Sequence, residues 1–358
     1  MENILDSTLL TIAVILTFAT LLALVRSQKR DRCVTHFDDY HVTLAEKDGY
    51  VNWGLLNVRT TGLELTYPQA MRSKKGFWKQ SFLFYKEQYE AMDAVYRCTA
   101  GLSEDKLAKR ERYLKRTSKP GLLRRLYRHL RNWVGMIRDA LVQAVTVLVG
   151  VAKSQSQPSA AVLAQDEERV TTLSDELIGH AGNAYDPLLE KHLFTRVVID
   201  VTRQGEVHKY CGYLADYTSD FLEIIDAQVN ADEHHFERKT FTADEAPVDD
   251  VDIRIDENLL AIENRAGRML LLHELLSDDA VIPVDAVIPD GFSAQLRLGT
   301  EIDTETLEIV VATPNRVDML VPRSRAIVRH GISGLSREEL EEAPQTFFDE
   351  NLNPFRRS

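Results

Sequence analysis

Two groups of residues have side chains of the types that catalyse reactions or bind metals. Cys211 stands three positions after His208, in a segment that alternates like a β-strand. A thiol beside an imidazole can serve as a nucleophile with its general base. Strand alternation, however, places positions 208 and 211 on opposite faces. The spacing therefore predicts a buried structural thiol at Cys211.

The second group is an acidic run with two adjacent histidines, made of Asp232, Glu233, His234, His235 and Glu237. Side chains of this kind bind metal ions. On a helix, two adjacent histidines point about 100° apart and cannot reach the same ion. The surrounding stretch is rich in acids and typical of a solvent-exposed turn, so we expect no metal site. No dinucleotide, P-loop, zinc-protease or hydrolase motif occurs in the chain, and the sequence predicts no cofactor and no catalytic residue.

Charge divides the chain into two unlike halves. Residues 1–165 contain 25 basic and 15 acidic residues, whereas the remainder contains 18 basic and 40 acidic residues. The hydrophobic fraction of 44% and the charged fraction of 27% are ordinary for globular domains and exclude wholesale disorder. Three widely spaced cysteines, Cys33, Cys98 and Cys211, form neither a disulfide framework nor a CxxC metal pair, which favours reduced thiols.

The segment from 7 to 25 contains no charged residue and predicts a transmembrane helix. At about 1.5 Å per residue it reaches roughly 28 Å, enough for the hydrocarbon core of a bilayer. The charged residues before it, within 1–6, are acidic, and four basic residues follow it: Arg26, Lys29, Arg30 and Arg32. The positive-inside rule therefore predicts an external N-terminus and a cytoplasmic body, in a single-pass protein of a bacterial inner membrane.

Residues 103–153 predict a long amphipathic helix with a basic face. Twelve basic residues and one acid lie between Lys106 and Arg138, and apolar residues recur at steps of three and four. One interpretation packs the apolar stripe against the protein core, and another lays the helix among anionic lipid headgroups. In the second interpretation the lipid-binding residues are Arg124, Arg125, Tyr127, Arg128, Arg131 and Trp133. A third interpretation makes 132–152 a second span or a re-entrant hairpin, and the same stripe could join protomers.

Residues 34–98 predict a small β domain. HVTLAE, YVNWGLLNV and LELTY alternate like strands and are separated by turns. Residues 196–227 repeat this pattern, with Gly212-Tyr-Leu in the place of Gly54-Leu-Leu. Over about thirty residues per copy, such strongly bent antiparallel meanders resemble the first half of an Sm-like barrel. The RNA-contacting residues of Sm-like proteins have no identifiable counterparts in this sequence, so the resemblance implies a fold and no function.

The remaining segments complete the expected organisation. Residues 154–193 predict a hinge and a helix, residues 194–333 an acidic β-rich domain of one or two units, and residues 334–358 a tail. The stretch from 232 to 257 is acidic enough to predict a solvated excursion rather than a core element. The expected fold class is α+β and membrane-anchored, with one transmembrane helix, small antiparallel β units, a long basic amphipathic helix and a distal β-rich region.

These features favour a non-enzymatic, membrane-anchored scaffold or regulatory protein. Its expected partners are anionic lipid headgroups and either other proteins or copies of itself. A nucleic-acid partner is not expected, because the neighbouring membrane offers the basic segment the same polyanionic attraction at shorter range. Two alternatives stay open: a subunit of an oligomeric pore or channel-like assembly, and an enzyme whose site is assembled from dispersed residues.

Overall fold

The computed structural model of the chain describes residues 30–72, 77–99, 102–118, 186–230, 238–242, 250–256, 258–277, 280–299, 302 and 306–332. Of this described part, 60% lies in strands and 14% in helices. The strands form one sheet of 13 strands and a second sheet of 4 strands. The described chain is therefore mostly β.

The first β unit begins with a short helix, α2 (Arg32–Thr35). Asp31 caps this helix, because its carboxylate accepts a hydrogen bond from the N–H of Val34. Neighbouring strands are antiparallel, in the order β5-β1-β2-β3-β4. The elements that follow the helix are β1 (His41–Glu46), β2 (Tyr50–Val58), β3 (Gly62–Arg72), β4 (Trp78–Tyr85), the 3-10 helix η1 (Lys86–Ala91) and β5 (Met92–Cys98).

The second β unit has the same plan but is interrupted by a long insert. Asp186 caps its short helix α6 (Pro187–Lys191) as Asp31 caps α2. The strand order β17-β6-β7-β8-β16 is again antiparallel throughout. The strands of this unit are β6 (Arg196–Arg203), β7 (Glu206–Tyr217), β8 (Phe221–Gln228), β16 (Arg316–Pro322) and β17 (Ala326–Ile332). The insert lies between β8 and β16, where the first unit has the turn between β3 and β4.

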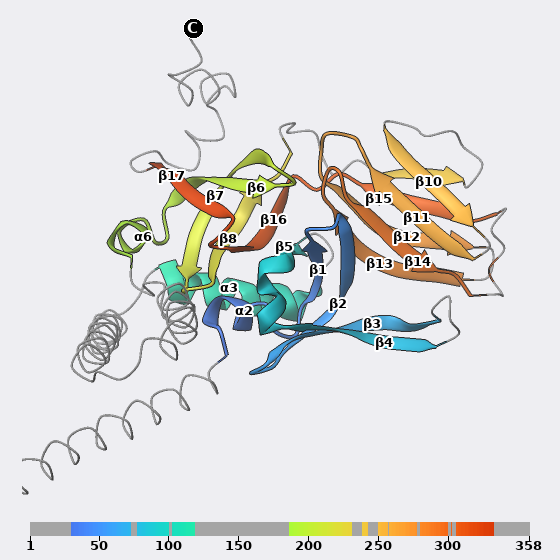
Figure 1. The fold of residues 1–358 in the computed structure, drawn as a ribbon, viewed down its shortest axis with the longest axis horizontal. Helices are drawn as coiled ribbons and strands as arrows, with labels where there is room; N and C mark the ends of the chain where they lie inside the picture. The colour runs from blue at the N-terminus through green and yellow to red at the C-terminus, as the bar shows by residue number, and fades with distance from the viewer. Residues whose placement is uncertain are drawn as a thin grey trace, which may run out of the picture.

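Backbone contacts repeat between the two units. Asp39 and Phe194 both adopt the left-handed conformation, with φ of 67° and 62°, although neither is glycine. The N–H of Asp39 donates to the carbonyl of Leu56 at 2.8 Å, and the N–H of Phe194 donates to the carbonyl of Leu214 at 2.7 Å. The same strained turn therefore leads into the first strand of both units, which are two copies of one pattern (Figure 1).

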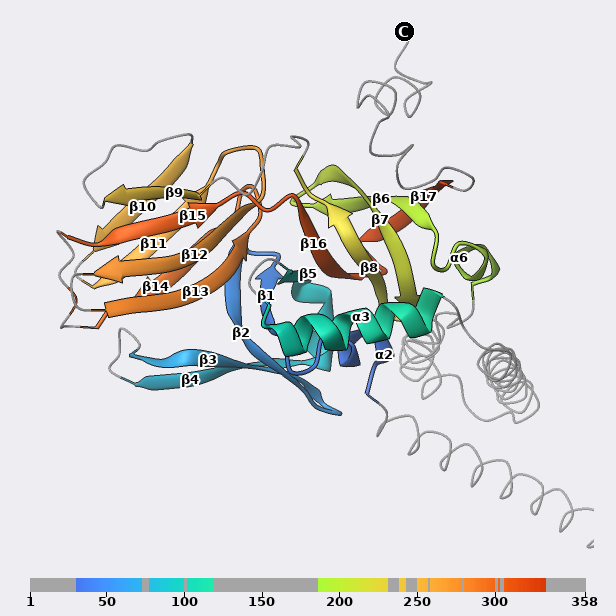
Figure 2. The same ribbon diagram turned by 180° about the vertical axis from the view of Figure 1, so that it is seen from behind.

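The two units are joined by β16, which pairs with β8 of its own unit and with β5 of the first unit. We call the β5·β16 pairing the inter-unit joint. Its antiparallel register sets Leu320 opposite Val95 and Asp318 opposite Arg97. Figure 2 shows β16 between β5 and β8, with the helix α3 (Glu104–Ser118) lying across this side of the sheet.

The insert contains seven described strands that pack as two layers beside the two units. β10-β11-β14 extend the large sheet, because β14 pairs in parallel with β2, and β13-β12-β15-β9 form the small sheet. The larger hydrophobic cluster runs through the insert and the second unit and includes Trp53 and Tyr96 of the first unit. A smaller cluster fills the first unit and includes Leu320 of β16. The strands of the insert are β9 (Arg238–Thr242), β10 (Val251–Asp256), β11 (Leu259–Asn264), β12 (Leu270–Ser277), β13 (Ala280–Ile288), β14 (Ser293–Arg297) and β15 (Glu308–Ala312).

The structure corrects the expected fold class. An α+β protein with a long basic helix was expected, whereas the described chain is mostly β and its strands form no closed barrel. The Sm-like barrel expected from the meanders is therefore not formed. The pairing of β16 with β5 explains this difference, because the last strand of the first unit and the fourth strand of the second unit join the two units into one continuous sheet. Within the expected basic helix at 103–153, the described part is α3, which ends at Ser118.

The expectation of a single-pass membrane protein is also corrected. No helix within the described ranges has both the length and the apolar character needed to cross a bilayer. The segment from 7 to 25 lies outside the described residues, as does the segment from 132 to 152. We therefore carry forward neither the membrane anchor nor the external N-terminus and cytoplasmic body that were derived from it.

The acidic stretch from 232 to 257 was expected to be a solvated excursion. Two of its segments are strands, β9 and β10, which lie at the outer edges of the small and large sheets. β9 pairs with β15 and β10 pairs with β11 through backbone hydrogen bonds. An acidic composition does not prevent this pairing, because the backbone groups and not the side chains form the bonds. Acidic residues on β10, such as Asp252, are accommodated because an edge strand keeps one side open to solvent.

Candidate functional site

The inter-unit joint contains a buried ion cluster. Arg97, on β5, donates from Nε and Nη2 to the same oxygen, Oδ2 of Asp318 on β16, at 3.0 and 2.7 Å. The exposed fractions of the two residues are 1% and 0%. The Arg97 guanidinium also lies over the rings of Phe37 and Tyr40, at 4.4 and 4.3 Å from their centroids. A pair this deeply buried holds the two units in one register.

A third charge reaches this cluster from α3. Arg110 donates to both carboxylate oxygens of Asp318 at 2.7 and 2.8 Å and to Asp226 at 2.6 Å. Burial alone would raise the pKa of Asp318, but Arg97 and Arg110 outweigh it and hold that pKa below its usual value. The carboxylate of Asp318 therefore remains charged and ties α3 to the joint.

A second ion cluster lies at the other end of β5. Asp93 accepts a hydrogen bond from Arg203 of β6 at 2.9 Å and another from Arg325 at 2.8 Å. Arg203 also donates to the hydroxyl of Tyr96 at 2.5 Å. Burial raises the pKa of Tyr96, so the phenol stays protonated. Charged clusters thus fix both ends of β5.

A third buried group centres on Glu223 of β8. One of its oxygens contacts Nδ1 of His36 at 2.7 Å and accepts a hydrogen bond from the hydroxyl of Tyr113 at 2.8 Å. Burial and the neighbouring Glu223 carboxylate raise the pKa of Tyr113. Tyr113 therefore stays a donor, and it fastens α3 to the second unit as Arg110 fastens it to the joint.

An open groove of about 360 Å³ lies where the hairpin turns of the two units meet the insert. We call it the turn groove. It is polar, and the one arginine in its lining, Arg254, is paired with Asp252. A groove of this kind can hydrogen-bond a polar ligand, but the described residues hold no group of three metal-binding side chains. The lining residues are Asp48, Gly49, Tyr50, Gln204, Asp252, Arg254, Ala261, Glu263, Gly291, Ser293 and Gln295.

The strand β4 presents an exposed apolar edge. It pairs with β3 on one side, and no strand of the described chain pairs with its other side. The exposed fractions of Trp78, Leu83 and Tyr85 are 72%, 52% and 50%, and the adjacent Phe77 is 68% exposed. Only Lys79 carries a charge within the strand. Sheet edges in soluble proteins are usually protected by charges, prolines or bulges, so an apolar edge of this length is a candidate binding surface.

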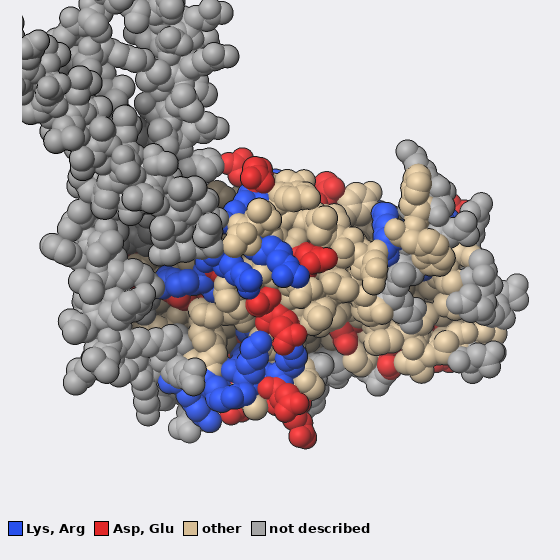
Figure 3. Space-filling model, turned by 90° about the horizontal axis from the view of Figure 1, so that it is seen from below, with Lys and Arg blue, Asp and Glu red and all other residues tan. Residues whose placement is uncertain are grey.

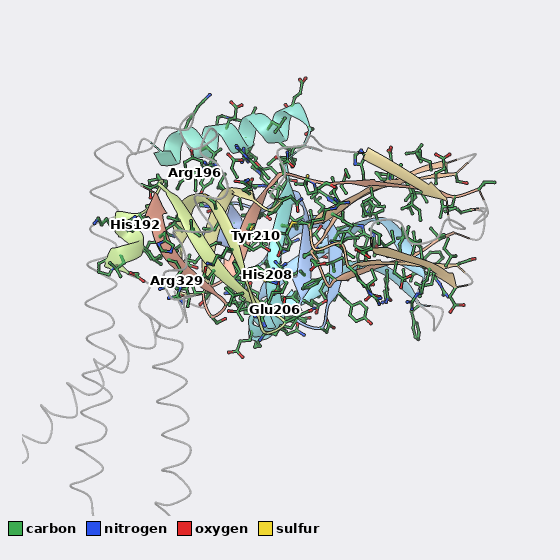
Figure 4. All side chains as sticks on the ribbon, turned by 90° about the horizontal axis from the view of Figure 1, so that it is seen from above. His192, Arg196, Glu206, His208, Tyr210 and Arg329 are labelled. Atoms are coloured by element: carbon green, nitrogen blue, oxygen red, sulfur yellow. The ribbon has the colours of Figure 1, made fainter. Side chains whose placement is uncertain are left out.

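The strand β17 presents a second open edge. It pairs with β6, and its other side has no strand partner within the described residues. Ile327 on this strand is 52% exposed, and Arg329 forms an ion pair with Asp200 of β6 at 3.0 Å. Figure 4 places Arg329 and His192 at the end of the molecule away from the insert. In Figures 1 and 2, β17 and β4 lie at opposite sides of the protein.

On the face drawn in Figure 3, charge does not form one continuous basic patch. Figure 3, viewed from below, shows lysines and arginines interleaved with aspartates and glutamates. On α3, for example, Lys115 pairs with Glu111 at 3.4 Å, and Lys109 lies 3.6 Å from Asp39. The basic residues of this face are thus partly neutralised by neighbouring acids.

The residues singled out from sequence have different outcomes. The predicted lipid-binding residues Arg124, Arg125, Tyr127, Arg128, Arg131 and Trp133 lie outside the described residues, as do His234, His235 and their acidic neighbours. His208 and Cys211 lie on β7, opposite Val201 and Val198 respectively. Cys211 was expected to be buried, but it is only half-buried, and this partial burial raises the pKa of its thiol. Of these predicted residues, the structure describes only His208 and Cys211.

The ion clusters and the two open edges were missed by sequence reasoning. A signal for the clusters exists, because Arg97 and Asp318 interrupt otherwise apolar strands, VYRC and VDMLV. Comparison with known protein families, with curated proteins and with solved structures finds no match to this chain. The function must therefore be argued from the chain itself.

Proposed function

We propose that the chain is a non-enzymatic scaffold that binds an extended protein segment by strand addition at the edge of β4. The observation that carries this proposal is the open side of β4 together with its exposed side chains, above all Trp78 and Leu83. In strand addition, backbone hydrogen bonds supply affinity and alternate side-chain contacts supply specificity. A partner with alternating apolar residues suits the exposed Leu83 and Tyr85, which share one face of the strand.

The arrangement of the buried charges supports a scaffold rather than an enzyme. The charged side chains of the joint, Arg97, Asp318 and Arg110, are saturated by one another. A catalytic group must instead reach a substrate. The proposal uses neither the predicted lipid contacts nor the pore alternative, because both concern segments outside the described residues.

The test is selection of decapeptides from a random library on the purified full-length chain, followed by hydrogen exchange of the complex. Bound peptides should protect the amides of 78–85, which have no strand partner on one side. Substitution Leu83→Lys should weaken binding by about tenfold or more, because it places a charge within an apolar contact. Val207→Lys is the matched control, since Val207 is 58% exposed but lies on β7, opposite Thr202 of β6 and outside β4. Protection confined to other strands would contradict the proposal.

A further inference from the structure

We propose that the partner of the β4 edge is the β17 edge of a second copy of the chain, so that copies join head to tail through a repeat of the inter-unit joint. This inference rests on the proposed strand addition and names its partner. The observation behind it is that the two β units of the chain share one strand order and already pair with each other at one edge. Within one chain, the last strand of the first unit, β5, pairs with the fourth strand of the second unit, β16. The two strands left without this pairing are the fourth strand of the first unit, β4, and the last strand of the second unit, β17.

The positions of β17 can be matched to those of β5. Val42 faces Gly54, and Val197 faces Gly212, which makes Val42 and Val197 equivalent. Two positions later, Leu44 pairs with Val95. The corresponding Ile199 pairs with Val328. Val328 on β17 is therefore the counterpart of Val95 on β5.

The positions of β4 can be matched to those of β16 in the same way. Leu56 pairs with Leu65, and Leu214 pairs with Ile224, which makes the preceding residues Glu64 and Glu223 equivalent. Glu64 pairs with Leu83. Glu223 pairs with Leu320. Leu83 on β4 is therefore the counterpart of Leu320 on β16.

These matches fix the register of the pairing between copies. In the inter-unit joint Val95 lies opposite Leu320, so between copies Val328 of one chain lies opposite Leu83 of the next. Val95 and Leu320 have no exposed surface within the joint. Leu83, in contrast, is 52% exposed in the single chain. Pairing with a second copy gives Leu83 the burial that its counterpart already has.

The two open edges also match at the charged position of the joint. Arg97 and Asp318 lie opposite each other there. On β1, Thr43 lies opposite Tyr96, so Arg97 takes the place opposite Val42. On β17 the register shifts by one residue between Val328 and His330, and Gly331 lies opposite Val197, the equivalent of Val42. The counterparts of Arg97 and Asp318 are therefore Gly331 on β17 and Ser81 on β4. Both charged partners are absent together, so neither edge leaves a buried charge unpaired when the edges meet. The two edges thus lack the ion pair of the joint but can still pair with each other without burying an unpaired charge.

The contact joins two different surfaces and is therefore heterologous. Such contacts produce a ring when the rotation between copies closes, and an open filament when it does not. β4 and β17 lie at opposite sides of the chain, so the two edges of one copy cannot pair with each other (Figures 1 and 2).

Mixing of two edge-blocked variants tests the inference. Leu83→Lys blocks β4, and Ile327→Lys blocks β17 at a side chain that is 52% exposed. By sedimentation velocity, the full-length chain should self-associate, and each variant alone should do so at least about tenfold more weakly. An equimolar mixture of the two should form a complex of one copy of each and stop there, because only one intact pair of edges remains. Val207→Lys should associate like the unmodified chain.

Other outcomes overturn the inference. A variant that still associates fully on its own, or a mixture that stays monomeric, excludes head-to-tail pairing of these edges. An unmodified chain that stays monomeric but protects 78–85 when it binds library peptides overturns self-pairing and leaves strand addition standing. If the chain neither self-associates nor protects 78–85 when peptides are added, both self-pairing and strand addition are wrong. Circular dichroism and thermal unfolding of each variant verify that the substitutions leave the fold intact.

A pair of cysteines tests the register directly. Directly opposed residues of antiparallel strands have Cβ atoms about 4.5–5.5 Å apart, close to the range that a disulfide spans. Oxidation of a mixture of Leu83→Cys and Val328→Cys chains should yield a covalent dimer of unlike chains. A mixture of Tyr85→Cys and Val328→Cys, displaced by two residues, should yield several-fold less. Equal yields from both mixtures would contradict the register.

Discussion

Arg97 and Asp318 are 221 positions apart in the chain, yet Nε and Nη2 of the arginine both donate to one oxygen of the aspartate, at 3.0 and 2.7 Å. The arginine belongs to the first β unit and the aspartate to the second. Because both residues are buried, this ion pair is made only when the two units are in the register that sets β5 against β16. The pair therefore specifies how the units join.

Removal of either partner should be far more costly than removal of both. Arg97→Met or Asp318→Leu leaves a buried charge with fewer partners and should lower the free energy of unfolding by about 3–5 kcal/mol, measured by urea denaturation. The double variant should lose clearly less than the sum of the two. Arg59→Met, in an exposed pair with Glu64, is the control and should cost less than about 1 kcal/mol. Additive single effects would show that the two residues do not act as a pair.

The pH dependence of stability should report Asp31. Burial raises the pKa of its carboxyl from 3.8 to about 6, against the hydrogen bonds from Thr218 and Val34. Since the folded state holds this proton more tightly, the contribution of Asp31 to stability is present below pH 4 and is lost as the pH rises through 6. Asp31→Asn keeps an acceptor for the helix cap and cannot ionise. It should therefore match the unmodified chain at pH 4 and exceed it by about 1–3 kcal/mol at pH 7 in urea unfolding. An equal difference at both pH values would contradict this assignment.

Much of the strand pattern could be predicted from sequence, whereas the way the strands assemble could not. HVTLAE and YVNWGLLNV alternate, contain β-branched or aromatic residues and end at turns, and both are strands, β1 and β2. The pattern of KEQYEAMDAVYRC fits either a strand after a tight turn or the start of a helix, and the segment divides into the 3-10 helix η1 and the buried strand β5. Local periodicity cannot distinguish the helical part from the strand, because β5 is buried by its pairing with β16, which lies more than two hundred residues away in the chain.

The candidate surfaces were hidden for the same reason. Leu83 and Tyr85 lie in the apolar run FLFY, which is typical of a strand, but only the pairing pattern shows that one side of that strand is open. Likewise, Arg97 within an apolar strand is usually taken as a solvent-facing residue. Its burial depends on Asp318, which no local pattern connects to it.

Two equivalent glycines should tolerate no larger side chain. A Cβ at Gly54 would lie 2.4 Å from the carbonyl oxygen of Thr66, and a Cβ at Gly212 would lie 2.6 Å from Cγ2 of Ile224. Gly54→Ala should be the more damaging of the two, by about 1–3 kcal/mol in urea unfolding, because a backbone atom cannot move aside as a side chain can. Gly205→Asn is the control, since nothing lies within 4 Å of its Cβ position and asparagine tolerates its φ of +88°. A smaller loss at Gly54 than at Gly205 would show that the bend of β2 does not need this close approach.

The docking of α3 should depend on Arg110. Of the described side chains on this helix, Arg110 and Tyr113 reach the buried acids, and Arg110 makes three contacts with Asp318 and Asp226. Arg110→Ala should therefore raise hydrogen exchange of the amides of 104–118 by about tenfold or more, the change expected for loss of one buried charged contact. Arg112→Ala is the matched control, because Arg112 is exposed and, among the described residues, bonds only to the carbonyl of Ala108 within the same helix. If both variants leave exchange unchanged, α3 is held by its apolar contacts, and the joint is stabilised by Arg97 without help from the helix.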